Sequence, residues 1–442
     1  MTGKNVILLL FSIAFYTYGE PKAVVLMIIS IVMNYVFGIF VKKENKFRKS
    51  VLITSVAANL AMLGIFKYAG FGAEMLNRLP FLSVTIPHIG LPIGISFYTF
   101  QAMSYVIDAY KDPKYIQKNL FKLALYITFF PQLVAGPIVK YYDFADQIEN
   151  RRTTPEQTAE GIRRFITGLS KKLLIANTMA LTADSIYAMD TSSLSAPLAW
   201  LGAVSYLFQI YFDFSGYSDM AIGMGAMFGF RFRENFNYPY ISQSMQDFWR
   251  RWHISVSTWF KEYLYIPLGG NRKGKLRTAF NKLIVFFCTG LWHGASLNFI
   301  VWGLINGGFM MLESYKLINP GKWFRPFRHI YALFVTILAF VFFRADDLPT
   351  ACSYILHMFT VSGDQVQRAL FLQQLSPLYI MIFILAVIFS MPVVQKIREK
   401  AASQRSAAIC EYASYGISLV LLGICILSLS SASYNPFIYL RF

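Results

Sequence analysis

The sequence predicts an all-α, polytopic membrane protein. Of its 442 residues, 56% are hydrophobic and only 14% are charged, and the mean hydropathy is +0.46. A soluble chain usually carries about a quarter charged residues. Apolar runs of about 20 residues, long enough to cross a hydrocarbon core of about 30 Å, recur from end to end. We expect about 10–12 transmembrane helices, together with re-entrant and amphipathic helices.

The apolar segments divide the chain into its expected elements. A glycine-rich run at 216–230 adds another crossing or a re-entrant piece. With no internal repeat and no low-complexity linker, the chain is expected to form one membrane domain over residues 1–442. The main apolar segments are 5–19, 22–41, 50–70, 89–110, 119–138, 196–212, 280–312, 329–344, 376–394 and 412–430.

The charge pattern is that of a membrane protein. The net charge is +18, but Lys and Arg cluster in short loops between apolar segments, as the positive-inside bias predicts. Nucleic acid is therefore not an expected partner, and the strongly basic linker 42–49 is placed in the cytosol. The four cysteines lie singly in mostly apolar surroundings, so neither disulfides nor a metal site is expected.

Two segments differ from simple spans. Residues 129–137 carry two prolines and a glycine inside an apolar run, which indicates either a re-entrant element or a kinked span. Residues 153–188, with a helix start at Thr154, predict an amphipathic helix near the membrane surface. Its apolar stripe is punctuated by Arg163, Arg164, Lys171 and Lys172.

His293 lies inside the long apolar run 283–311. An ionisable group at membrane depth is expensive unless it faces a cavity or a partner. Histidine titrates near neutrality and can accept a proton from a nucleophile. Flanking Trp292 and Gly294 favour a functional site, because tryptophan can wall a pocket and glycine allows close approach. The alternative is a structural histidine satisfied inside a helix bundle.

A second histidine, His253, lies in the polar-aromatic stretch 245–263. At helical spacing it falls beside an apolar face containing Phe248 and Trp252, with Arg250 opposite. It therefore points toward protein. The alternatives are a packed histidine bonded to a carbonyl, or an anchor in an interfacial aromatic belt.

The turn 269–275 is glycine-rich and basic. Arg272, Lys273 and Lys275 could contact the phosphates of a nucleotide-like cofactor. The positive-inside bias explains them equally well.

Four motifs together resemble the membrane-bound O-acyltransferase family, and within it the bacterial branch that O-acetylates exported polysaccharides such as alginate. The motifs are Leu91–Gln101, Phe130–Ile138, Asp247–Ser255 and Leu291–Ala295. The resemblance runs from about residue 90 to Asp346 and on to the C-terminus. It implies an all-α fold around a central funnel, with peripheral helices in 1–88, a catalytic core in 89–345, and C-terminal helices with an aromatic tail in 346–442.

The resemblance also implies roles for residues and partners. His293 matches the family's invariant histidine and His253 its second histidine. Acetyl-CoA is the implied cytosolic donor, no cofactor is bound permanently, and an exported esterase-like (SGNH) acetyltransferase finishes transfer to a polysaccharide. The implied location is the bacterial cytoplasmic membrane, in contact with lipid. The substrate-binding candidates are Trp292, Trp249, Trp252, Asp247, Arg250 and Gln132, and the cofactor-binding candidates are Arg272, Lys273 and Lys275.

Residues 433–442 end the chain in an aromatic run, where a terminus is usually polar. They resemble a family motif in which a tyrosine carries the acyl group transiently, although Leu440 and Arg441 depart from the more common Phe-Gln. Tyr439 is the matching residue. A phenol activated by a base is a sensible relay, since its ester is a good acyl donor. The alternative is an interfacial aromatic anchor.

Three functions compete. The first is a membrane O-acetyltransferase in which His293 is the general base, His253 assists and Tyr439 is the candidate hydroxyl. The second is transfer of D-alanyl or another acyl group from a carrier protein to teichoic acid. The third is a proton-coupled transporter with the two histidines as a relay, which predicts inverted-repeat symmetry that the sequence does not clearly show.

Overall fold

The structure is a computed structural model that describes residues 2–87, 89–360, 363–400, 404–431 and 436–438. This part of the chain contains helices and no strand, which confirms the predicted all-α class. The chain divides into two compact units, Met1–Gly161 with Met224–Arg233, and Ile162–Gly223 with Glu234–Phe442. The single membrane domain expected from the sequence stays a prediction.

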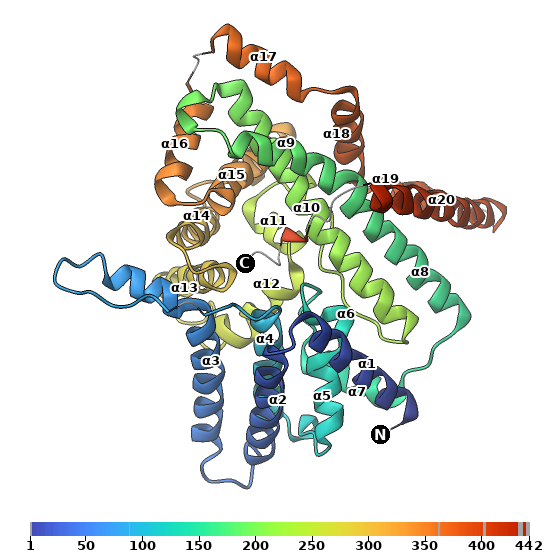
Figure 1. The fold of residues 1–442 in the computed structure, drawn as a ribbon. Coiled ribbons are helices and arrows are strands. Elements are labelled where there is room, and N and C mark those ends of the chain that lie inside the picture. The colour runs from blue at the N-terminus through green and yellow to red at the C-terminus, as the bar shows by residue number, and fades with distance from the viewer. Residues whose placement is uncertain (1, 88, 361–362, 401–403, 432–435, 439–442) are drawn as a thin grey trace. The chain divides into compact units, whose positions relative to one another are not determined.

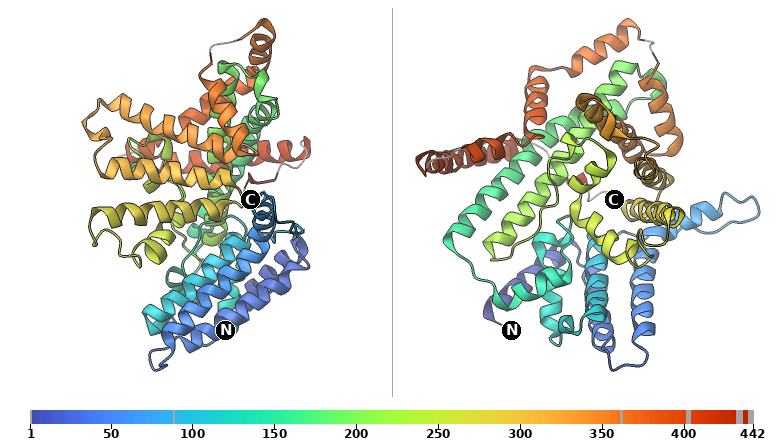
Figure 2. Two further views of the ribbon diagram at one scale, coloured as in Figure 1. Left: turned by 90° about the vertical axis from the view of Figure 1, so that its left-hand side faces the viewer. Right: turned by 180° about the vertical axis from the view of Figure 1, so that it is seen from behind.

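The first unit is a bundle of helices, in which α2, α3, α4 and α5 pack side by side (Figure 2). Asn34 and Asn59, both fully buried, join α2 to α3 through two amide hydrogen bonds of 3.0 and 2.8 Å. Such polar pairs give apolar helices a directional contact. The elements are α1 Gly3–Gly19, α2 Ala23–Phe40, α3 Arg48–Leu76, α4 Ile95–Lys111, η1 Pro113–Tyr115, α5 Leu120–Thr128, α6 Phe130–Leu133 and α7 Tyr141–Asn150.

The proline-containing segment 129–137 is broken, as its sequence predicts. α5 ends at Thr128, α6 is a single turn, and residues 134–140 are not helical. Most of this irregular backbone is buried. Whether it is a re-entrant element stays a prediction.

The second unit holds the remaining helices (Figure 1). Helices α8 and α10 each also contribute residues to the first unit. The elements are α8 Pro155–Ser170, η2 Lys171–Ala176, α9 Asn177–Tyr187, η3 Thr191–Ser193, α10 Ala196–Met227, η4 Pro239–Ile241, α11 Met245–Arg251, α12 Ile254–Phe260, η5 Lys261–Tyr265, α13 Lys275–His293, α14 Leu297–Ser314, η6 Pro320–Lys322, α15 Arg325–Arg344, α16 Leu348–Met358, α17 Gln365–Gln374, α18 Pro377–Phe389, α19 Val393–Lys400 and α20 Gln404–Ser431.

Several helices can cross a membrane, which supports the polytopic class. Four in the described residues are long and apolar enough: Ala23–Phe40, Arg48–Leu76, Arg325–Arg344 and Ala408–Ser431. The pair α17 and α18, bent by 65°, makes a fifth if it is one broken span. The expected number of about 10–12 spans stays a prediction.

The segment 153–188 begins a helix at Thr154, as predicted, but two of its basic side chains form ion pairs that the sequence did not predict. Thr154 Oγ1 accepts the Gln157 N–H at 3.2 Å and so caps α8. Arg164 and Lys171 both bind Asp219, at 2.9 and 2.6 Å. These basic side chains therefore pair with a carboxylate inside the protein, a use that the amphipathic pattern did not predict.

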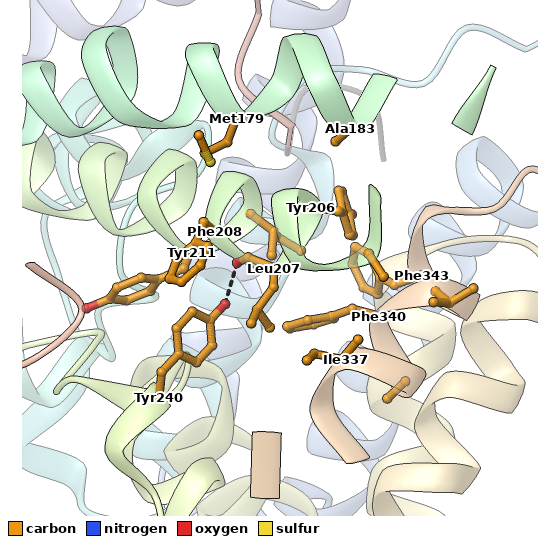
Figure 3. Close-up of a cluster of buried hydrophobic side chains, with 14 of the residues drawn as sticks. Met179, Ala183, Tyr206, Leu207, Phe208, Tyr211, Tyr240, Ile337, Phe340 and Phe343 are labelled. Atoms are coloured by element: carbon orange, nitrogen blue, oxygen red, sulfur yellow. Dashed lines mark hydrogen bonds between the residues drawn. The ribbon is translucent and has the colours of Figure 1, made fainter. Parts of the chain in front are cut away.

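A cluster of buried aromatic and aliphatic side chains holds the second unit together (Figure 3). Residues of α10 such as Leu207 meet Phe340 and Phe343 of α15. The Tyr240 hydroxyl donates to the Leu207 carbonyl oxygen at 2.5 Å. The same face of α15 ends at Phe343, which borders the candidate site.

Candidate active site

His293 lies at the break between two antiparallel helices. The apolar run 280–312, expected as one segment, is two helices, α13 and α14, which lie side by side (Figure 1). α13 ends at His293, and Ser296 starts α14 by accepting the Asn298 N–H on its hydroxyl at 3.1 Å. Hydropathy cannot reveal such a break, because the residues on both sides are apolar.

Glycines let these two helices approach closely. A Cβ at Gly290 would collide with the carbonyl oxygen of Phe299, and one at Gly303 with that of Phe286. Small residues are what allow helix backbones to meet in membrane proteins. The end of α13 that carries His293 is therefore held directly against α14.

An aromatic enclosure surrounds His293, which is only 3% exposed. Its ring centroid lies 4.9 Å from Trp292, 4.9 Å from Trp302 and 5.2 Å from Phe343. These residues come from α13, α14 and α15. The imidazole thus lies among apolar rings, an environment that excludes bulk water.

His253 lies at a second break. The helix expected over 245–263 is interrupted, because α11 ends at Arg251 and α12 begins at Ile254. His253 adopts φ 42°, in the left-handed region that few side chains enter. It is fully buried, as its place beside the apolar face predicted. The continuous helix was wrong, since a left-handed residue cannot continue a right-handed helix.

Hydrogen bonding assigns the tautomer of His253. Asn235 Oδ1 accepts the Ser255 backbone N–H at 3.1 Å, so this atom is the amide oxygen. The 3.2 Å contact between His253 Nδ1 and Asn235 Oδ1 therefore requires Nδ1 to carry the proton. The Asn235 amide nitrogen donates to Ser218 Oγ at 3.0 Å. In the neutral ring, the lone pair is then on Nε2.

The two histidines converge within the second unit. Their ring centroids lie 6.1 Å apart with the planes at 57°. Trp292 lies beside both, 5.9 Å from His253 and 4.9 Å from His293. Phe214 of α10 packs edge-on against His253 at 4.6 Å. Two imidazoles in one aromatic enclosure can accept, hold and orient a proton without water.

The other two candidate tryptophans are Trp249, in α11, and Trp252, which directly follows the last residue of α11. Trp249 donates its indole N–H to Asn306 Oδ1 at 3.1 Å and packs 5.8 Å from Trp302. Trp252 stacks on Phe248 at 5.6 Å. Both tryptophans are buried. In this position Trp249 supports Trp302, which in turn contacts His293.

The other substrate-binding candidates differ in burial and in their hydrogen-bond partners. Asp247 accepts from Arg251 Nε at 3.0 Å, and Arg250 is exposed. Gln132 belongs to the first unit, where it is fully buried and donates to the Tyr126 carbonyl at 2.9 Å.

The basic turn lies at the opposite end of α13 from His293. Arg272, Lys273 and Lys275 are all exposed. α13 has 19 residues, so its ends are about 27 Å apart. Only a long, extended ligand could touch both the turn and His293.

Tyr439 lies outside the described residues. Pro436, Phe437 and Ile438, which come just before it, are described and belong to the second unit.

Sequence reasoning missed the residues that hold the histidines in place. Asn235 lies 18 residues from His253, with no spacing that links them. Trp302 and Phe343 are ordinary apolar helix positions in the sequence. Only the packing of α14 and α15 against α13 brings their rings to His293.

Residues 13–345 match the model of the MBOAT, membrane-bound O-acyltransferase family. The chain is 38% identical to a probable alginate O-acetylase of Azotobacter vinelandii, over 99% of this chain and 95% of that protein. It is also 38% identical to a peptidoglycan O-acetyltransferase of Helicobacter pylori, over 80% of this chain and 74% of that protein. With a teichoic acid D-alanyltransferase of Bacillus subtilis it shares 29% identity, over 61% and 73% of the two chains. This multi-pass membrane protein is thus an O-acyltransferase, and it belongs to the membrane-bound O-acyltransferase family.

Proposed function

We propose that the protein takes acetyl from cytosolic acetyl-CoA and moves it through the membrane for O-acetylation of an exported or cell-surface polysaccharide. Relatives named for O-acetylation of alginate and peptidoglycan, each 38% identical, support an acetyl group and a glycan acceptor. Acetyl-CoA is too large and too charged to cross a bilayer, whereas an acetyl group is small and neutral.

The observation that carries the proposal is the convergence of His253 and His293 in one buried aromatic enclosure. In the proposed step the Tyr439 hydroxyl oxygen attacks the thioester carbonyl carbon while His293 accepts its proton. The new C–O bond forms and the C–S bond breaks. The proton then passes to the departing thiolate, which leaves as free CoA thiol. A positioned general base contributes about 10²–10⁴-fold.

His253 has an assisting role in this proposal. Its Nδ1–H is held by Asn235, which fixes the orientation of the ring. Placed 6.1 Å from His293, it can orient the reacting groups around the base. The surrounding aromatic side chains would limit hydrolysis of the thioester by excluding water.

The exposed turn that carries Arg272, Lys273 and Lys275 is the proposed contact for the charged part of acetyl-CoA. Since it lies about 27 Å from His293 along α13, the donor would bind in an extended form. The protein would lie in the bacterial cytoplasmic membrane. An exported esterase-like acetyltransferase outside would receive acetyl from Tyr439 and deliver it to the polysaccharide.

Replacement of His293 tests the proposed base. The His293→Ala protein should fold and elute normally in detergent, while O-acetyl content of the exported glycan falls by about 10²–10⁴-fold. His357 on α16, whose Nδ1 contacts the Ser353 carbonyl, provides a matched control, and His357→Ala should acetylate normally. Unchanged acetylation by folded His293→Ala protein would exclude His293 as the base.

Replacement of Tyr439 tests the acceptor. Tyr439→Phe removes only the hydroxyl, so it should abolish transfer while leaving the aromatic ring of an interfacial anchor in place. Normal acetylation by this variant would favour the interpretation of the tail as an interfacial anchor. The hydroxyl group that first accepts acetyl would then belong to the partner enzyme or to the polysaccharide.

A second function, D-alanyl transfer from a carrier protein, is favoured only by the weaker similarity to the teichoic acid enzyme. Purified protein offered radiolabelled acetyl-CoA or a D-alanyl-charged carrier protein distinguishes the two. Label entering the protein from acetyl-CoA alone supports the proposal, whereas acceptance of the charged carrier alone overturns it.

A further inference from the structure

A buried ion pair in the second unit has no part in the chemistry proposed above. Lys172 of η2 and Asp213 of α10 form a salt bridge, and their side chains are only 5% and 2% exposed. Two charges removed from water require close pairing and further hydrogen bonds. The partners that supply those hydrogen bonds indicate what the pair does.

Both members of the ion pair also bind the main chain of the C-terminal tail. Lys172 Nζ donates to the carbonyl oxygen of Pro436 at 3.1 Å. Asp213 Oδ2 accepts the backbone N–H of Ile438 at 2.8 Å. The ion pair thus forms hydrogen bonds to the backbone on both sides of Phe437.

Side chains of the tail complete the contact. The Phe437 ring packs at right angles to Tyr217, with centroids 5.0 Å apart. Lys172 Nζ lies 4.8 Å from the centroid of the same ring, within the range of a cation–π contact. Ile438 is 6% exposed and belongs to the hydrophobic cluster of the second unit. This segment is therefore packed into the protein.

On α10, the residue that binds Ile438 is next in sequence to the residue that contacts His253. Asp213, which holds Ile438, is followed by Phe214, whose ring packs 4.6 Å from His253. Tyr439 follows Ile438 directly, and consecutive Cα atoms are about 3.8 Å apart. Binding of Ile438 therefore bears directly on the chemistry proposed for Tyr439.

We propose that Lys172 and Asp213 form a clamp that binds tail residues 436–438 and so positions Tyr439 for acyl transfer. The two charged residues are positioning residues, because they act through the tail. Binding of the tail stands on the contacts alone. The positioning of Tyr439 for transfer rests on the function proposed above.

A substitution in the tail tests the clamp without disturbing the buried charges. Ile438→Pro removes the N–H that Asp213 accepts, since proline has no amide proton. Ile438→Ala is the matched control, because it also removes the side chain but keeps the N–H. We expect acetylation by Ile438→Pro to fall about 10²-fold below that by Ile438→Ala, as expected for a misplaced reacting group.

A second experiment reads tail binding directly and does not depend on activity. The photoreactive amino acid p-benzoylphenylalanine replaces Phe437 in the full-length, membrane-embedded protein, and mass spectrometry locates the crosslinked peptide. We expect the crosslink to reach the peptides around Tyr217 or residues 171–176. It should disappear in the Ile438→Pro background and persist in Ile438→Ala.

The clamp itself is tested with a paired substitution. The double variant Lys172→Met, Asp213→Leu replaces the ion pair by apolar groups, a change that usually preserves folding. Removing only one partner would leave an uncompensated buried charge. Lys171→Met is the control, because Lys171 pairs with Asp219, which keeps its contact to Arg164. We expect the crosslink to be lost in the paired variant only.

Each outcome separates the clamp from the proposed function. A crosslink elsewhere, or one that survives both Ile438→Pro and the paired variant, overturns the clamp. Loss of the crosslink with normal acetylation overturns the positioning role. If Tyr439→Phe acetylates normally while the crosslink behaves as expected, the acceptor role of Tyr439 fails and tail binding by the clamp stands.

Discussion

The rings of His253 and His293 lie 6.1 Å apart although they come from separate segments of the chain, and each stands at a break in helical structure. His293 ends α13, and His253 stands in a left-handed conformation between α11 and α12. Trp292 packs beside both. The site is therefore built where backbone changes direction, and its geometry depends on the residues that hold those breaks.

Asn235 is expected to act through His253. Asn235→Leu removes the acceptor of the Nδ1–H and frees the ring to rotate, so we expect acetyl transfer to fall about 10–100-fold, as for groups that orient a functional histidine. Asn235→Asp keeps an acceptor oxygen and should retain more activity. Activity is measured as O-acetyl content of the glycan.

A double-mutant cycle tests whether Asn235 acts through His253. His253→Asn is the suitable partner, because asparagine tolerates the left-handed backbone at this position. If Asn235 acts through His253, adding Asn235→Leu to His253→Asn should lower activity little further. Fully additive losses would show that Asn235 has another function.

Gly290 is expected to control the spacing of α13 and α14. Gly290→Ala forces a Cβ against the Phe299 carbonyl oxygen, and such overpacking costs about 1–3 kcal/mol. We expect a lower thermal unfolding midpoint in detergent. Gly308 on α14 has open space where its Cβ would lie, so Gly308→Ala should be tolerated and serves as the control. Equal midpoints for the two variants would contradict close packing at Gly290.

Glu313 is expected to hold the start of α11. Its carboxylate accepts the backbone N–H groups of Met245 at 2.6 Å and Gln246 at 3.0 Å, together with the Tyr331 hydroxyl at 3.1 Å. Glu313→Gln replaces an acceptor oxygen by a donor, which should destabilise the protein by about 1–3 kcal/mol.

Thermal unfolding in detergent measures the effect of Glu313→Gln. Glu160→Gln is the control, because Glu160 of α8 is exposed. This variant should leave the unfolding midpoint unchanged. A Glu313→Gln midpoint equal to that of the control would rule out a structural role for the carboxylate.

The basic turn before α13 is expected to affect donor binding and not chemistry. Replacement of Arg272, Lys273 and Lys275 by alanine should raise KM for acetyl-CoA with little change in kcat, because these residues lie about 27 Å from His293. Raising the ionic strength should weaken the donor's binding to the unchanged protein, since exposed charges are screened.

Three basic residues of another exposed loop provide the control. Replacement of Lys42, Lys43 and Lys46 by alanine removes the same charge from the loop after α2. It should leave KM unchanged. If both triple variants raise KM equally, the effect is general charge and the turn has no specific contact with the donor.

Features of the site that follow from residue type were predictable. A histidine in an apolar run predicted that His293 is buried, and it is 3% exposed, whereas its functional role stays a prediction. The apolar face of 245–263 likewise predicted the burial of His253. The prolines of 129–137 predicted the broken backbone after α5. In each case a single residue type has an energetic consequence that does not depend on distant parts of the chain.

Features that depend on long-range contacts were not predictable. The break between α13 and α14 lies within continuous apolar sequence, and the left-handed residue at His253 lies within a helical pattern. The partners Asn235, Trp302 and Phe343 are ordinary residues in ordinary segments. Likewise, Lys172 fitted an amphipathic stripe, although its side chain is buried against Asp213 and the tail.

The sequence by itself determined that this protein is helical, membrane-embedded and equipped with two inward-facing histidines, because hydropathy and the cost of burying an ionisable group are local properties. Only the tertiary structure decided where the helices break, which nitrogen of His253 donates to Asn235, and that residues 436–438 pack against Lys172 and Asp213. Those outcomes depend on close packing and directional hydrogen bonds between segments far apart in the chain, for which local sequence patterns carry no signal.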